Sequence, residues 1–167
     1  GQADDYIGNL SPKDGLFNRY DVPPGSGPHN LIVDEDRNVW FSANRKRFIG
    51  KLSPSTGQIS RFDMPNRKAK DPHTMVFDPA GDIWFTVQKG NFIGKLTTTD
   101  GTIELIQVES KKVRPDGIIV DRDNMPWVVA FGSNKLLQIF PDTMTIAEID
   151  LPDVDSRPRR LVSTSNG

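Results

Sequence analysis

A repeat of 43 to 44 residues runs through the chain and limits the folds that it can adopt. The tryptophans lie 44 and 43 residues apart: Trp40, Trp84 and Trp127. A proline stands 12 residues before each of them, and a fourth proline extends the series: Pro28, Pro72, Pro115 and Pro158. This period is the length of one four-stranded blade of a β-propeller. The repeat therefore predicts an all-β propeller, with the tryptophans packed as core between neighbouring blades.

Within each unit the pattern is that of four short strands. In the first unit, short apolar or alternating runs are separated by polar turns and cover residues 31–33, 39–42, 48–52 and 58–62. Runs of this kind are typical of strands, and no stretch of the chain keeps a helical period. Gly50 and Gly94 recur in the third run of two units, where they indicate a close approach between strands.

The repeat also predicts how the chain divides into blades. We expect one partial propeller domain over 1–167, with four-stranded blades at 28–65, 72–108 and 114–152, the last two strands of a blade at 5–23 and the first strand of another at 157–167. A partial ring leaves unpaired strand edges, which readily bind further strands. The remaining blades of a propeller, or self-association, are therefore expected to cover these edges.

Composition gives no general attraction to polyanions and limits the function little beyond that. The net charge of −1 and the pI near 6.1 give no bulk attraction to nucleic acid or to an anionic membrane. Hydrophobic residues make up 35% of the chain, and no apolar run reaches the length of a membrane span. The absence of cysteine excludes disulfides and thiolate metal sites, and is compatible with a cytoplasmic as well as a periplasmic or secreted location.

Several short motifs recur at matching places in the units. Pro-His opens two units, Trp-Phe follows at 40–41 and 84–85, and Ile-Gly-Lys-Leu follows at 49–52 and 93–96. In this respect the chain resembles the virginiamycin B (streptogramin) lyase family, whose propellers are related to NHL-repeat and gluconolactonase-type propellers. The resemblance extends from Ile7 to about Leu161 and is more specific for the fold than for an activity.

The resemblance implies a candidate active site. Lyases of this family open a cyclic depsipeptide ester by elimination, with two histidines, a glutamate and a magnesium ion. His29 and His73 match the histidine positions, and Asp71 keeps a carboxylate just before the later one, where it is the candidate magnesium ligand. The glutamate position falls on Gln88 or Val87, and a glutamine can form hydrogen bonds but cannot accept a proton.

A ring of polar residues follows the repeated prolines. Its members are His29, His73, Asp116 and Arg159. The repeat predicts that they lie at one level beside the central tunnel, with Asp116 and Arg159 as candidate binding residues for a small molecule at the tunnel mouth. The alternative is that the histidines only fill space and bond to a neighbouring loop.

Three classes of function remain open. The first is a lyase acting on a cyclic ester or lactone, and the second is a non-catalytic binding or scaffold propeller. The third is anion or nucleic-acid binding by the basic loops that enter the blades: Arg67, Lys68, Lys70, Lys111, Lys112, Arg114, Arg157, Arg159 and Arg160. Acidic residues among these loops, and the lack of aromatic platforms for stacking bases, argue against nucleic acid.

Overall fold

The computed structural model describes residues 2–164, and all regular structure in them is β. A hairpin of β1 (Tyr6–Leu10) and β2 (Phe17–Asp21) comes first. The first four-stranded sheet contains β3 (Pro28–Val33), β4 (Val39–Ala43), β5 (Phe48–Leu52) and β6 (Ile59–Asp63). The second contains β7 (Pro72–Phe77), β8 (Ile83–Val87), β9 (Phe92–Leu96) and β10 (Ile103–Gln107). The third contains β11 (Pro115–Val120), β12 (Pro126–Ala130), β13 (Lys135–Phe140) and β14 (Thr145–Asp150).

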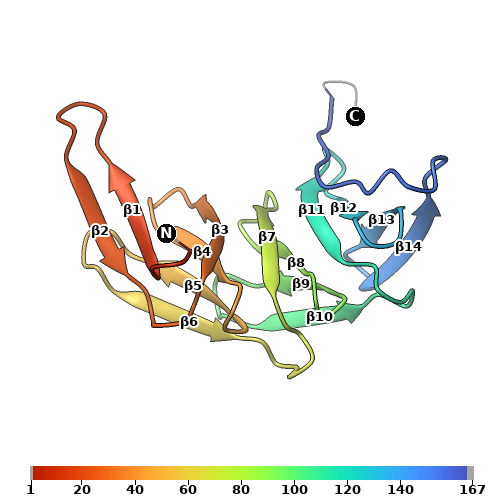
Figure 1. Cartoon of the computed structure of the whole chain (residues 1–167), viewed down its shortest axis with the longest axis horizontal. Helices are drawn as coiled ribbons and strands as arrows, with labels where there is room; N and C mark the ends of the chain where they lie inside the picture. The colour runs from red at the N-terminus through yellow and green to blue at the C-terminus, as the bar shows by residue number, and fades with distance from the viewer. Residues whose placement is uncertain (1, 165–167) are drawn as a thin grey trace.

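The sheets are arranged as blades of a propeller. Each is antiparallel with its strands in sequence order, and the three stand side by side along an arc (Figure 1). The first strands β3, β7 and β11 lie on the concave side of the arc, and the last strands β6, β10 and β14 lie on the convex side. The all-β propeller fold predicted from the repeat is confirmed.

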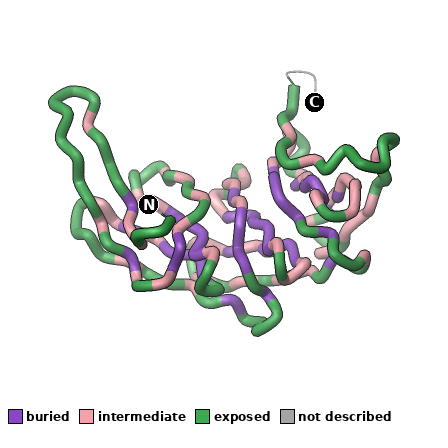
Figure 2. The backbone as a smooth tube through the Cα atoms, in the orientation of Figure 1, coloured by how far each residue is buried: buried purple, intermediate pink, exposed green. Residues whose placement is uncertain are grey.

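The hydrophobic core lies between neighbouring blades. Trp40 from the first blade packs in a cluster made mainly of second-blade residues, and Trp84 packs in the same way against the third blade. Both indoles are 1% exposed, whereas Trp127, which no further blade of residues 2–164 covers, is only half-buried. Buried residues are concentrated in the middle strands β4, β5, β8 and β9, and Figure 2 shows that the β1–β2 hairpin is largely exposed. The core prediction holds for the first two tryptophans and in part for the third.

The glycines of the third strands accommodate aromatic rings. Gly50 pairs with Phe41 across the sheet, and Gly94 pairs with Phe85. A Cβ atom at either glycine would lie 2.2 Å from Cζ of that phenylalanine. The close approach predicted for these positions therefore involves a cross-strand ring lying on the glycine, and a side chain there would displace the ring.

The C-terminal segment differs from its expectation. A first strand was expected over 157–167, but its described part, 157–164, forms no strand. A strand requires hydrogen bonds to a neighbour, and no strand of the described residues pairs with this segment. The backbone at Arg159 still packs against Gly117 of β11, where a Cβ would lie 2.5 Å from the carbonyl oxygen of Arg159.

No helix in residues 2–164 is long and apolar enough to cross a membrane.

Candidate functional site at the tunnel mouth

An irregularity at the start of each inner strand presents the candidate residues. The pairing register shifts between Pro28 and Leu31, between Pro72 and Met75, and between Pro115 and Ile118. A bulge releases residues from the ladder and redirects their side chains. His29, His73 and Asp116 lie in these three irregular stretches, which explains why the residues after the prolines can face one another across the blades.

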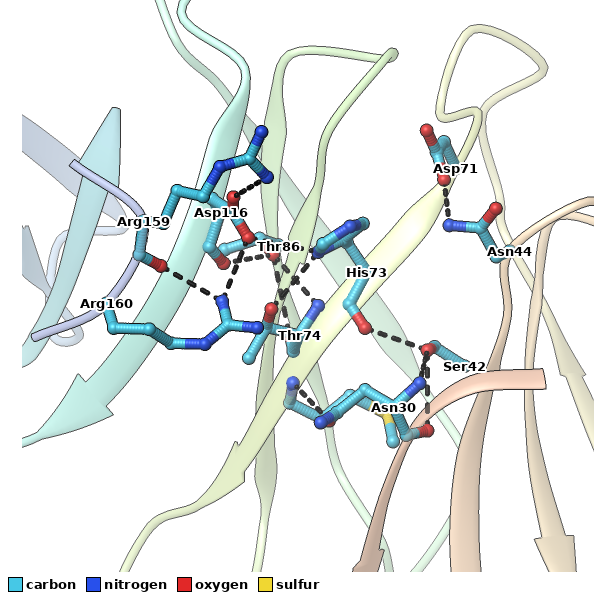
Figure 3. A network of polar contacts seen from close by, with 11 residues as sticks. Asn30, Ser42, Asn44, Asp71, His73, Thr74, Thr86, Asp116, Arg159 and Arg160 are labelled. Atoms are coloured by element: carbon cyan, nitrogen blue, oxygen red, sulfur yellow. Dashed lines mark hydrogen bonds and ion pairs between the residues drawn. The ribbon is translucent and has the colours of Figure 1, made fainter. Parts of the chain in front are cut away.

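Hydroxyl groups on the second strands join the bulges of neighbouring blades. Ser42 Oγ accepts the N–H of Asn30, at 3.1 Å, and donates to the carbonyl of His73, at 2.8 Å. Thr86 Oγ1 repeats the arrangement one blade later, accepting from Thr74 N at 3.1 Å and donating to the carbonyl of Asp116 at 2.9 Å. Both hydroxyl residues are fully buried. The backbone that carries His73 and Asp116 is therefore fixed from the preceding blade (Figure 3).

The predicted ring forms a continuous row of polar contacts. The imidazole centroids of His29 and His73 are 4.0 Å apart. His73 Nδ1 lies 3.3 Å from Asp116 Oδ1 and 3.1 Å from the hydroxyl of Thr74. Arg159 and Arg160 reach Asp116 from the other side, at 3.4 and 3.1 Å. The repeat predicted that the residues after the four prolines lie together, and the structure adds Arg160 to them.

Burial divides the row into an inner part and an outer part. Asp116 is 1% exposed and His73 is 9% exposed, whereas His29 and both arginines are exposed. A buried carboxylate needs cationic or hydrogen-bonding partners, and here it has His73 and two guanidiniums. His73 and Asp116 are therefore held in a fixed geometry beneath the exposed side chains that meet solvent.

The environment lowers the pKa of His73. Burial is the largest cause, and the neighbouring imidazole of His29 adds to it, while Asp116 acts in the opposite direction. A neutral imidazole that carries its proton on Nδ1, beside Asp116 Oδ1 and the Thr74 hydroxyl, keeps a lone pair on Nε2. In this state His73 is able to accept a proton from a ligand.

The lowered pKa predicts how stability depends on pH. The unfolded chain binds the proton at the ordinary histidine pKa of 6.5, above the folded-state value. Protonation therefore favours unfolding, and the unfolding free energy should fall as the pH decreases below 6.5. Denaturant titrations across this range should show a weaker pH dependence in His73→Asn. If the unfolding free energy depended on pH identically in the unmodified chain and in His73→Asn, the lowered pKa of His73 would be contradicted.

The carboxylate of Asp71 contacts residues that do not belong to the row. Its carboxylate is 5% exposed, accepts a hydrogen bond from Asn44 Nδ2 and lies 3.2 Å from Lys89 Nζ. Figure 3 shows it directed toward Asn44. Val87 is fully buried in the core, and Gln88 is half-buried with its N–H bonded to the carbonyl of Asp71. Neither alternative for the glutamate position supplies a carboxylate.

The side chains do not fit the magnesium ion that the family resemblance implies. Mg²⁺ requires hard oxygen ligands in a near-octahedral arrangement. The row offers two imidazoles and one carboxylate that already binds His73 and two arginines, and Asp71 is occupied by Asn44 and Lys89. Among the described residues, no group of three or more His, Cys, Asp or Glu side chains could hold a metal.

Sequence reasoning did not identify the residues that support the row. Ser42 and Thr86 each stand two positions after a tryptophan, a recurrence that was visible in the repeat. Asn30 also connects blades, since its Oδ1 accepts the N–H of Met75 at 3.0 Å. The third blade has Val129 at the hydroxyl position, so it lacks the side-chain bridge that the first two blades share.

Removing one bridge should destabilise the chain measurably. Ser42→Ala leaves the N–H of Asn30 and the carbonyl of His73 without their buried partner, and we expect a loss of about 1–2 kcal/mol in unfolding free energy. Ser60→Ala, at an exposed position of β6, is the matched control and should change little. Equal effects of the two substitutions in denaturant melts would show that the bridge contributes nothing.

Comparisons with solved structures agree with this architecture. Virginiamycin B lyase from Staphylococcus aureus matches with a TM-score of 0.86 and 26% identity, over 95% of this chain and 53% of that one. A catalytically inactive variant of the same enzyme, solved with quinupristin, gives the same values. A streptogramin B lyase matches with a TM-score of 0.84 and 30% identity, over 93% of this chain and 51% of that one.

The chain thus spans about half the length of the lyases that it matches. No curated protein sequence matches it significantly. The model of the virginiamycin B lyase family matches residues 1–167, the whole length of the chain. Together with the blade repeat and the structural matches, this shows that the chain belongs to the virginiamycin B lyase family.

Proposed function

We propose that the tunnel mouth binds a cyclic depsipeptide ester of the streptogramin type, with His73 as the proton acceptor for an elimination. The observation that carries the proposal is the buried contact between His73 Nδ1 and Asp116 Oδ1, at 3.3 Å. A carboxylate that accepts Nδ1–H orients an imidazole as a general base and stabilises it once protonated. The lowered pKa of His73 keeps this base unprotonated at neutral pH.

The proposed elimination needs no reagent other than the ligand and a proton acceptor on the chain. His73 Nε2 takes a proton from the carbon next to a carbonyl, a C=C bond forms, and the ester C–O bond breaks to release a carboxylate. Arg159 and Arg160 lie beside Asp116 with side chains 62% and 68% exposed, so their guanidiniums can approach the departing oxygens. No step is assigned to magnesium, because the donor set does not fit it.

The chain alone should bind the ester without opening it. It provides about half of the ring found in the matched lyases, and it has no carboxylate at the glutamate position. Positioning and general acid groups from other blades would therefore be needed for turnover. This separates ligand binding, a property of this chain, from catalysis, a property of the completed ring.

Calorimetry with quinupristin tests the proposal. We expect saturable binding by the chain, with an affinity about tenfold lower in His73→Ala. The control variant Asn18→Ala, at an exposed position of the β1–β2 hairpin, should bind quinupristin with nearly unchanged affinity. Chromatography of the incubated ligand should detect no isomeric ring-opened product, with or without added magnesium. Absence of binding, or equal affinity of the two variants, would refute the proposal.

The open edges support a second proposal about assembly. The two-stranded hairpin exposes Leu10, Leu16 and Phe17 by 64%, 63% and 56%, and an isolated hairpin is marginally stable. We propose that further blades or a second copy of the chain cover this edge. Light scattering should therefore show concentration-dependent association. A monodisperse monomer with full amide protection from Phe17 to Tyr20 would contradict it.

A further inference from the structure

A cleft separate from the polar row lies between the third blade and the C-terminal segment. It has a volume of about 480 Å³ and lies between the loop before β11, the turn after β12 and the chain after β14. Figure 1 shows this last segment turning back across the end of the blade. Its lining includes three cationic side chains, Lys112, Arg114 and Arg157, against a single acidic one, Asp155. The cleft therefore concentrates positive charge in a chain whose net charge is −1.

The three cations are free to bind a ligand. Within residues 2–164, none of Lys112, Arg114 and Arg157 forms an ion pair with a carboxylate. Lys89, in the turn after β8, is by contrast paired with Asp71. Unpaired cations that converge on a concave site attract anions more strongly than isolated surface charges do.

The cleft orients at least one of these charges. The guanidinium carbon of Arg157 lies 4.8 Å from the ring centroid of Phe131, and that of Arg159 lies 4.0 Å from the same centroid. Stacking on an aromatic ring holds a guanidinium in place while leaving its N–H groups available. Phe131 already carries these two arginines, so it is a poor platform for a nucleic-acid base.

Two buried polar atoms of the lining lack partners. Among the described residues, Ser133 Oγ and Asn134 Oδ1 form no hydrogen bond, although both atoms are buried. The equivalent residue of the second blade, Asn91, uses its Oδ1 to accept the N–H of Val113 at 2.9 Å. Buried polar atoms normally have a partner. The Ser133 hydroxyl is therefore available to donate to an oxyanion.

We propose that this cleft binds the phosphate group of a small molecule. Lys112, Arg114 and Arg157 would neutralise the charge, with the forked guanidiniums matching two phosphate oxygens and Ser133 adding a neutral donor. A carboxylate ligand would engage fewer of these groups than a tetrahedral dianion does. None of the lining residues belongs to the row of His73 and Asp116, which meets the cleft through Arg159 on Phe131, so the proposed binding does not depend on the proposed lyase chemistry.

Calorimetry with pyrophosphate at low ionic strength tests this site. We expect saturable binding at one site per chain that weakens as salt is added. Arg114→Gln should lower the affinity about tenfold, while Lys111→Gln, which removes the same charge just outside the cleft lining, should change it less than about twofold. Arg114→Lys should fall between them, because it keeps the charge and loses the fork.

Three outcomes would overturn the proposal. One is the absence of pyrophosphate binding by the unmodified chain, and another is an equal loss in Lys111→Gln and Arg114→Gln. The third is a single-stranded oligonucleotide that binds more tightly than pyrophosphate at equal phosphate concentration, which would assign the surface to a polyanion. His73→Ala should bind pyrophosphate normally, so the test is independent of the tunnel-mouth site.

Discussion

Replacing Trp84 by alanine is expected to lower the unfolding free energy by about 3–5 kcal/mol. The indole is 1% exposed and belongs to the cluster that joins the second blade to the third. Its removal leaves a cavity between two sheets that are otherwise connected mainly through side chains, so the loss includes a cavity term as well as lost burial. Urea titration followed by far-ultraviolet circular dichroism measures it without depending on tryptophan fluorescence.

Two further substitutions make this prediction specific. Trp127→Ala removes the same side chain from a half-buried position and should cost clearly less. His73→Ala, in the polar row, should also cost far less than the loss of Trp84. If His73→Ala and Trp84→Ala were equally destabilising, His73 would be a core residue and the proposed role in ligand binding would fail.

A methyl group at Gly94 is expected to cost about 3 kcal/mol. The added Cβ would lie 2.2 Å from Cζ of Phe85, and both residues are fully buried, so the ring has little room to move. Denaturant melts of Gly94→Ala measure the loss, which arises from overpacking, not from backbone strain. The φ angle of Gly94 is not in the left-handed region.

A smaller side chain at position 85 provides the control. In the double variant Gly94→Ala with Phe85→Leu, the methyl group no longer meets the end of a ring, so the combined loss should be smaller than the sum of the single losses. Strict additivity would show that the ring of Phe85 is not what excludes a side chain at Gly94.

The repeat allowed much of this structure to be predicted from the sequence. Equivalent positions in successive blades must lie side by side, so the contact between His29 and His73 and the contact between His73 and Asp116 follow from their places after the prolines. The burial of Trp40 and Trp84 follows in the same way. These features depend on the period alone, and the period is set by strand and turn lengths.

Features that depend on side-chain direction could not be predicted in this way. Asp71 is close to His73 in sequence, but its backbone has φ of 71° and its carboxylate meets Asn44 and Lys89. The strand expected over 157–167 also failed to form in its described part, since pairing requires a neighbour as well as a suitable sequence. Arg160 was missed because its contact with Asp116 arises from this irregular segment.

The titration of the two imidazoles by nuclear magnetic resonance tests the central claim, the buried His73–Asp116 pair as a proton acceptor at the tunnel mouth. The chain has only two histidines, so His73→Asn assigns both signals. We predict a His73 pKa below 6.5, a neutral ring protonated on Nδ1, and shifts of both imidazole signals when quinupristin is added. A His73 pKa at or above 6.5, together with imidazole signals that do not respond to quinupristin, would contradict it.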